Sequence, residues 1–254
     1  MSLDPRARFS QTTTDYARFR PSYPAALVPL ILQHAPVPPG GTIVDLGAGT
    51  GLSTRLFAGR GYHVIGVEPN AAMRAEAEPL PDVHFVAGEA RATGLVAGSA
   101  ALIVSGQAFH WFALEETLPE LRRILAPGGR LAVFWNLRDD SQPFMQDYQA
   151  LLHTLGEYAK VPQGGATIAA LDLRPELRPV WGEDLPHQQS FDEAGLLGRA
   201  RSSSYVAHAS AAEQGSFFAA LSALFARYAE AGLVRFEYRT TLRIYAFQGD
   251  VGAA

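Results

Sequence analysis

A strand-like segment that runs directly into a glycine-rich turn constrains this chain more than any other feature. Residues 42–46 read TIVDL, a short apolar run, and residues 47–51 read GAGTG, with helix-compatible sequence over 52–58. Glycine lets the backbone turn sharply and approach a ligand closely, and a helix that begins there presents unpaired N–H groups. The pattern predicts the first strand–turn–helix unit of an α/β fold, with a ligand at the turn.

Strand and helix signals continue to alternate until about residue 137. Asn70 is a predicted N-cap, and the amphipathic spacing over 114–125 predicts a helix closed by Pro127-Gly128-Gly129. Further short apolar runs predict strands at 62–67, 83–86, 100–105 and 130–135. This order predicts an α/β fold: a Rossmann-like, doubly wound, mostly parallel sheet with helices on both faces.

The alternation stops after the fifth strand. Apolar spacing predicts helices over 142–158 and 211–231, and alternating patterns predict closing strands within 180–191 and 235–248. A sheet of seven strands with a helical insertion after the fifth is therefore expected.

We expect this organisation to form one domain over residues 1–254. Its parts would be a nucleotide-binding core at about 25–137, an N-terminal lid segment at 9–24, and the insertion with closing strands at 138–248.

Composition removes several classes of function. Asp and Glu total 25 against 21 Lys and Arg, for a net charge of −4, so a nucleic-acid partner is not expected. The chain has no cysteine, which excludes disulfides and thiolate chemistry. No histidine or acidic cluster has metal-ligand spacing, and no apolar run suits a signal peptide or a membrane span. We expect a cytoplasmic protein, monomeric or homodimeric, without metal, membrane or nucleic acid.

Two acids flank the glycine turn. Glu68 ends the second predicted strand, where a carboxylate can hold a ribose diol. The dinucleotide fingerprint is Gly-x-Gly-x-x-Gly, but here Gly51 comes one residue early, and Asp45 would repel a pyrophosphate. The sulfonium and ammonium of S-adenosylmethionine (SAM) suit the acid better. An NAD-linked oxidoreductase and a turn without ligand remain the alternatives.

Several segments of the sequence resemble a known protein family. The segment VDLGAGTGLSTRLFAGRGYHVIGVEPN is similar to the first motifs of class I SAM-dependent methyltransferases, and the resemblance covers more than half the chain. The segments YARFRPSYP, GQAFHWF, PGGRLAVFWN and RARSSSY resemble the type 11 subgroup, which includes trans-aconitate methyltransferase-like proteins. The resemblance implies methyl transfer to a small-molecule acceptor, with the carboxylate of a small organic acid as one candidate. A SAM-binding protein without turnover is a further alternative.

The resemblance also implies a set of cofactor-binding residues. The glycine turn would wrap the methionyl part of SAM, the acid before it would contact the amino group, and the acid after the second strand would hold the ribose. The start of the next helix would lie against the adenine. The residues concerned are Asp45, Gly47, Ala48, Gly49, Gly51, Glu68, Pro69 and Met73.

Two further cofactor contacts are expected at strand ends. The subgroup usually has Ala-Glu where this chain has Ala90-Arg91, so the acid at the adenine is either lost or replaced by Glu89, and the Ala90 N–H is an alternative contact. The alternative is that Glu89 and Arg91 belong to a solvent-exposed loop without a role in binding. Gln107 follows the fourth strand and would face the transferring methyl group. No Pro-Pro-Tyr or Pro-Pro-Phe run stands there, which argues against methylation of bases or glutamine.

His110 and Trp111 follow at the rim of the expected site. A histidine can act as general base near neutral pH, and the tryptophan can wall a substrate pocket. Packing at the start of the next helix is the alternative role for both.

The remaining candidates come from the lid segment and the end of the fifth strand. Tyr16 and Arg20 are expected at the cofactor, and an arginine there can pair with a carboxylate of SAM or of an acidic substrate. The residues expected at the substrate are Arg18, Tyr23 and Asn136, with Arg138 as a weaker candidate beside Asn136.

Overall fold

The computed structural model describes residues 21–249, except 78 and 161–163. The chain forms two compact units, a core unit and an insertion unit. The core unit comprises Pro24–Trp135, Gln163–Leu185 and Thr241–Ala254. The insertion unit comprises Met1–Tyr23, Asn136–Pro162 and Pro186–Thr240.

The sheet has seven strands in the order β3-β2-β1-β4-β5-β7-β6, mostly parallel with two antiparallel strands, which confirms the predicted fold class. In the parallel part, Val44 of β1 aligns with Ile65 of β2 on one side and Ile103 of β4 on the other. The strands are β1 (Thr42–Leu46), β2 (His63–Val67), β3 (Val83–Val86), β4 (Ala100–Gly106), β5 (Leu125–Arg138), β6 (Leu177–Phe191) and β7 (Val234–Phe247).

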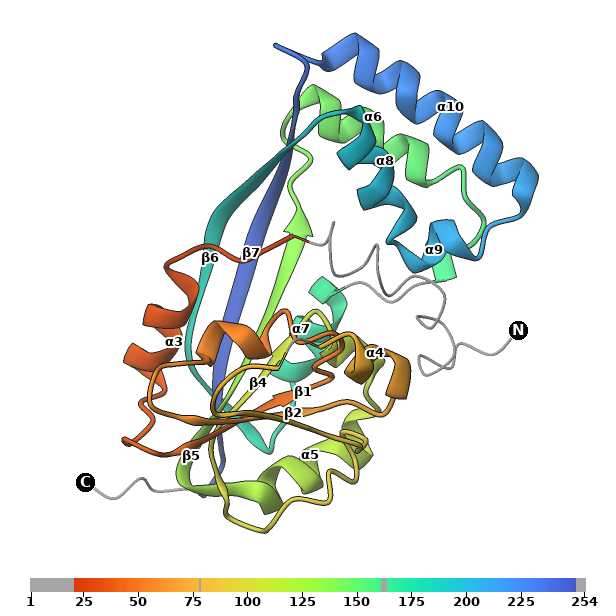
Figure 1. Ribbon diagram of the computed structural model, residues 1–254. Coiled ribbons are helices and arrows are strands. Elements are labelled where there is room, and N and C mark those ends of the chain that lie inside the picture. The colour runs from red at the N-terminus through yellow and green to blue at the C-terminus, as the bar shows by residue number, and fades with distance from the viewer. Residues whose placement is uncertain (1–20, 78, 161–163, 250–254) are drawn as a thin grey trace. The chain divides into compact units, whose positions relative to one another are not determined.

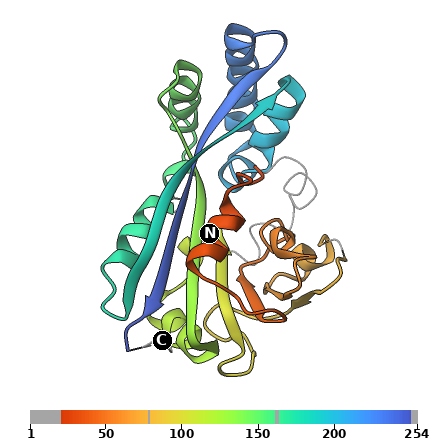
Figure 2. The same ribbon diagram turned by 90° about the vertical axis from the view of Figure 1, so that its left-hand side faces the viewer.

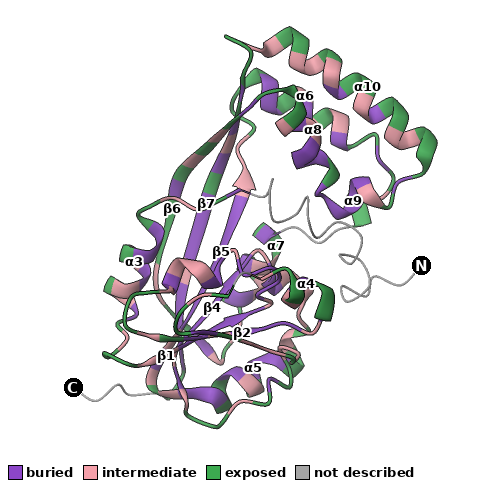
Figure 3. Ribbon diagram, viewed as in Figure 1, coloured by how far each residue is buried: buried purple, intermediate pink, exposed green. Residues whose placement is uncertain are grey.

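The central parallel strands form the interior of the core unit. Ile43, Val44 and Leu46 of β1 are fully buried, and most of β4 is buried as well (Figure 3). Such strands are apolar along their whole length because helices cover the sheet. The helices of this unit are α3 (Leu27–His34), α4 (Ala71–Ala75), α5 (Leu114–Ile124) and α7 (Gly164–Asp172), drawn in Figure 1.

Two elements of the core unit differ from the sequence expectation. The helix expected over 52–58 is a single 3₁₀ turn, η1 (Thr54–Phe57), in which Thr54 hydrogen-bonds to the Asp45 carboxylate and Phe57 is fully buried. This anchoring to the strand end competes with a regular helix. Strand β5 begins at Leu125 instead of 130, with an irregularity in its pairing to β4.

The insertion unit packs its helices around aromatic side chains. Helix α10 lies beside α6 and α8 (Figures 1 and 2), and Phe144, Tyr148 and Phe236 are among the buried rings between the elements of this unit. The expected helix over 142–158 stops at Leu152, and α8 and α9 had no clear signal in the sequence. The elements are α6 (Pro143–Leu152), η3 (Tyr158–Lys160), α8 (Glu193–Arg201), α9 (Ser204–Ala207) and α10 (Ala211–Tyr228).

Within the described ranges, no helix is both long enough and apolar enough to cross a bilayer. In the same ranges, His, Cys, Asp and Glu side chains nowhere gather in threes as a metal ion would require.

Candidate functional site

Asp45 lies fully buried at the end of β1, where the chain enters the glycine turn. Its Oδ2 accepts hydrogen bonds from Ser53 Oγ and Thr54 Oγ1, both at 2.6 Å, while its Oδ1 is a buried atom without a partner among the described residues. Burial raises the pKa of Asp45 to about 6; the two hydroxyls oppose this rise, and the charge of Glu68 adds to it. The site thus contains a buried acid with an unused acceptor.

Glu68 is buried one residue beyond β2, and its side chain connects the glycine turn to the start of α4. Its carboxylate accepts the backbone N–H of Gly49 at 3.0 Å and that of Asn70 at 2.8 Å. Burial raises the pKa of Glu68, and these backbone donors work in the opposite direction. A carboxylate has about four lone-pair sites, so two donors leave acceptor capacity for a ligand.

The glycine turn packs against two other parts of the core unit. Gly47 has φ of 69°, and a Cβ on it would lie 2.6 Å from Ala108 Cβ, so only glycine fits. Gly49 has φ of 57°, and a Cβ there would lie 3.4 Å from the methyl carbon of Met73. Asn70 caps α4 as predicted, with its side chain accepting the N–H of Met73 at 3.3 Å. The turn, the loop after β4 and the start of α4 therefore meet.

Gln107 holds the loop after β4 in an uncommon conformation. Its φ is 59°, a left-handed value that residues other than glycine rarely adopt, and its N–H bonds to Phe134 O at 2.9 Å. Ser105 Oγ bonds to Leu46 O at 2.9 Å, which links the ends of β4 and β1. Strained backbone of this kind concentrates at functional sites.

His110 lies in the short turn η2 (Phe109–Trp111) and accepts a hydrogen bond that sequence reasoning missed. The indole Nε1–H of Trp135 donates to His110 Nδ1 at 3.2 Å. Because an indole N–H can only donate, Nδ1 is unprotonated, and the neutral ring carries its proton on Nε2. Trp111 is half-buried, with its ring centroid 5.0 Å from that of His110.

The loop after β3 contains the predicted adenine contacts. Glu89 forms an ion pair with Arg91 at 2.9 Å, and Arg91 also pairs with Glu116 of α5 at 2.7 Å. Ala90 is half-buried, between the paired residues Glu89 and Ala92. Arg91 thus neutralises Glu89 in this structure.

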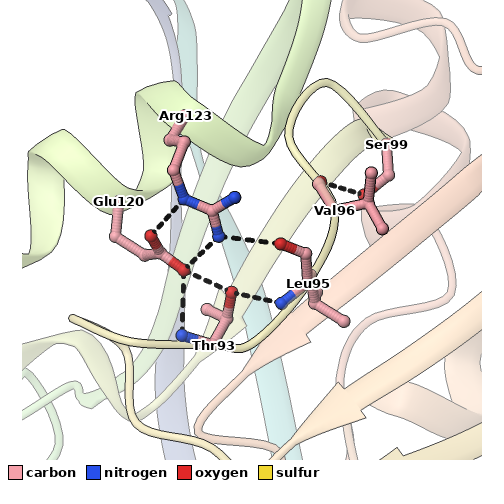
Figure 4. Close-up of polar contacts among 6 residues, drawn as sticks. All are labelled: Thr93, Leu95, Val96, Ser99, Glu120 and Arg123. Carbon is pink, nitrogen blue, oxygen red and sulfur yellow. Dashed lines mark hydrogen bonds and ion pairs between the residues drawn. The ribbon is translucent and has the colours of Figure 1, made fainter.

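The same loop is attached to α5 by a network that sequence reasoning did not find (Figure 4). Glu120 accepts Thr93 N–H at 2.9 Å and pairs with Arg123 at 2.7 Å, while Arg123 also donates to Leu95 O at 2.8 Å. The hydrogen bond and charge of Arg123, together with Thr93, lower the pKa of Glu120 to about 2, against the effect of burial. The network holds the loop on the helix.

The predicted contacts from the N-terminal segment and from the end of β5 do not fall within the described part of the core unit. Tyr16, Arg18 and Arg20 lie outside the described residues. Tyr23 and Asn136 belong to the insertion unit. There the Asn136 amide donates to Ser22 O at 2.9 Å, and its oxygen accepts from Thr240 Oγ1 at 2.6 Å.

The residues of the core unit fit SAM. Two buried oxygens, Asp45 Oδ1 and Thr50 Oγ1, have no partner among the described residues, so a donor on a ligand would satisfy them. Asp45 and Glu68 make the turn acidic, which suits a sulfonium and an ammonium and disfavours a pyrophosphate. Nothing in this geometry favours a dinucleotide.

Comparisons with known proteins agree with this arrangement. Residues 44–133 match the family model described as a methyltransferase domain. An uncharacterized methyltransferase of Schizosaccharomyces pombe is 37% identical over 188 residues, which cover 73% of this chain and 72% of that protein. A trans-aconitate 2-methyltransferase of Azoarcus sp. is 31% identical over 179 residues, covering 66% and 69%.

A solved structure shares the fold. It is described as a type II methyltransferase from Anaeromyxobacter dehalogenans and superimposes with a TM-score of 0.68 at 24% identity, over 89% of this chain and 97% of that one. The acid-flanked glycine turn, the seven-stranded sheet and these relatives lead to one conclusion. The chain belongs to the SAM-dependent methyltransferases.

Proposed function

We propose that this protein transfers the methyl group of SAM to a carboxylate of a small organic acid. The observation that carries the acceptor class is the hydrogen bond from Trp135 to His110 Nδ1. In this tautomer the other ring nitrogen is a donor, so His110 is poorly prepared to accept a proton. A carboxylate is already anionic and needs no base, whereas a phenol or an alcohol does. The likeness to trans-aconitate 2-methyltransferases supports the same class.

The cofactor would be held by the acid-flanked turn. Asp45 Oδ1 and Thr50 Oγ1 would receive the amino group and neighbouring donors of the methionyl part, and Glu68 would accept the ribose hydroxyls. Met73 would lie against the adenine. SAM supplies a methyl group on a positively charged sulfur, which is already a good electrophile.

The residues after β4 would position the acceptor. Gln107 and the Nε2–H of His110 would donate hydrogen bonds to it, and Trp111 would exclude water. In such a displacement the protein acts mainly by alignment and desolvation. The lid residues Tyr16, Arg18, Arg20 and Tyr23 and the amide of Asn136 remain proposed contacts to cofactor or substrate.

Product analysis tests the proposal. The protein is incubated with SAM and a panel of carboxylic acids that includes trans-aconitate, phenols and amines, and both S-adenosylhomocysteine (SAH) and the methylated product are measured by mass spectrometry. We expect methyl esters of one or more acids. Methylation of a phenol or an amine alone would overturn the acceptor class. SAM binding without any turnover would indicate a binding protein instead. The Glu183→Gln variant, altered at an exposed β6 residue of the core unit, is the control.

A further inference from the structure

The insertion unit buries an arginine whose partners among the described residues are all neutral. Arg199 of α8 is 4% exposed. Its Nε donates to Tyr238 Oη at 3.1 Å and its Nη1 to Ser203 Oγ at 3.0 Å, and the guanidinium lies 5.7 Å from the centre of the Phe236 ring. Among the described residues, Nη2 of Arg199 has no acceptor and the side chain forms no ion pair. Within the described part of the chain, this guanidinium therefore has unused donors and no negative partner.

A second arginine of the same unit lies close by. Arg138, at the end of β5, donates to Tyr158 Oη at 2.5 Å, Gln149 Oε1 at 3.0 Å and Tyr205 Oη at 3.3 Å. These partners are also neutral, and the charges of Arg138 and Arg199 influence each other. Arg138 is half-buried, so the pair is not sealed from the surface.

Tyr148 adds an unused donor to the pair. The residue is 1% exposed, and its hydroxyl has no hydrogen-bond partner within the described ranges. Burial raises the pKa of Tyr148 well above its usual value, although both guanidiniums oppose this rise. The hydroxyl therefore keeps its proton and can donate it in a hydrogen bond.

No acid among the described residues of the insertion unit forms an ion pair with either arginine. Asp147 pairs with Arg227 at 3.1 Å, and Glu157 pairs with Lys160 at 2.6 Å. A buried cation without a negative partner is costly, and proteins keep such groups where a ligand or a function compensates. Two neighbouring guanidiniums and an orphan hydroxyl, all donors, match the acceptor-only chemistry of an anion.

We infer that this arginine–tyrosine cluster binds a carboxylate group of a small organic acid. The cluster comprises Arg138, Tyr148, Tyr158, Arg199, Tyr205 and Tyr238. The planar guanidinium fork matches a carboxylate, and burial among aromatic rings disfavours the larger charge of a phosphate dianion. The sequence run RARSSSY supplies Arg199, Ser203 and Tyr205. Only the identification of this acid with the methyl acceptor rests on the proposed function.

Binding of matched acids and amides tests the cluster in the full-length chain without SAM. Malonate, succinate, tricarballylate, succinamide and inorganic phosphate are titrated by calorimetry into the wild type, Arg199→Met, Arg199→Lys and the control Arg201→Met. Arg201 is two residues away on α8, is exposed and stacks over the Phe218 ring. Cooperative thermal unfolding and SAH binding, both measured on the same samples, show that each variant is folded.

We expect the wild type to bind at least one of the acids and not succinamide. Arg199→Met should weaken acid binding at least 10-fold, Arg199→Lys should weaken it less, and Arg201→Met should leave it unchanged. The melting temperature of Arg199→Met without acid should equal or exceed that of the wild type, because an unbalanced buried charge is removed. If Arg199→Met does not fold, Tyr148→Phe, which removes only the orphan hydroxyl, should weaken acid binding as well.

Several results would overturn the inference. If the wild type bound none of the acids, bound succinate and succinamide equally, or bound phosphate more tightly than any acid, each result would contradict the cluster. Unchanged acid affinity in a folded Arg199→Met or Tyr148→Phe variant would contradict it as well. Failure of the proposed function looks different. Acid binding that depends on Arg199 without any methyl ester would leave the cluster standing and reject the function. Acid binding that depends on Arg199 together with undiminished ester formation by Arg199→Met would keep both and reject only the identification of the bound acid with the methyl acceptor.

Discussion

The carboxylate of Glu68 accepts the backbone N–H of Gly49 at 3.0 Å across 19 residues of sequence. The acid that ends the second strand therefore holds the glycine turn that follows the first. Its second bond, to Asn70 N–H, fixes the start of α4 in the same way. One side chain thus shapes the turn before any ligand binds, in addition to the role proposed for it at the ribose.

Replacing Glu68 should weaken cofactor binding. We expect Glu68→Ala to reduce the affinity for SAH by about 1–3 kcal/mol, the typical cost of leaving buried polar groups without a partner. Isothermal titration measures this effect. Glu183→Gln, altered at an exposed acid of the same unit, should bind SAH like the wild type. Wild-type affinity in Glu68→Ala would contradict the ribose assignment.

Asp45 should oppose folding and support binding. The rise of its pKa from 3.8 to about 6 corresponds to about 3 kcal/mol. Because the folded state holds the proton more tightly than the unfolded state, protonated Asp45 stabilises the folded protein below about pH 4. This stabilisation is lost as the pH rises to about 6, so that at neutral pH the buried carboxylate only opposes folding. We expect Asp45→Asn to unfold at a higher urea concentration than the wild type at pH 7.5 and to bind SAM at least 10-fold more weakly, by about 1.4 kcal/mol or more. If Asp45→Asn were less stable than the wild type and bound SAM with unchanged affinity, Asp45 would not have this role in cofactor binding.

The same titration should appear in the wild type as a pH dependence of affinity. Only the ionised carboxylate attracts the ammonium of SAM, so the affinity should fall as the pH drops below about 6, the pKa of Asp45 without ligand. Calorimetry between pH 5 and pH 8, compared with Asp45→Asn, measures the effect. A parallel pH profile in the variant would assign the dependence to another group.

Glu120 should stabilise the protein at moderately acidic pH. Its folded pKa of about 2 lies below the ordinary 4.5, so its contribution is present above pH 4.5 and is lost as the pH falls towards 2. Because the partner Arg123 is 42% exposed, we discount the contribution for solvent screening to about 1–2 kcal/mol. Urea unfolding of Glu120→Gln at pH 7 should show this loss, and the difference from the wild type should shrink at pH 2.5.

His110 should contribute little to proton transfer. For a carboxylate acceptor, we expect His110→Asn to lower kcat by less than about 10-fold, well below the 100- to 10,000-fold typical of a lost general base. The pH profile of kcat should keep its shape in this variant. Loss of an ionisation near neutral pH, together with a larger fall in kcat, would restore the base role.

The local signals of the sequence determined the βα alternation and the acid-flanked turn. Apolar runs such as 42–46 and 100–105 predict strands because strands buried on both faces exclude polar residues. Asn70 predicts the start of α4 because capping is a contact between near neighbours in the chain, and the structure confirms it. The fold class depends on such local patterns and was predictable.

Tertiary structure alone decided the contacts between distant residues. The hydrogen bond from Trp135 to His110 joins side chains 25 residues apart, and the one from Glu68 to Gly49 spans 19. Arg138 and Arg199 of the insertion unit lie close enough for their charges to interact, although 61 positions separate them in the sequence. No periodicity encodes these pairings, because they depend on which elements pack together. The tautomer of His110 and the assembly of the arginine–tyrosine cluster therefore depend on packing.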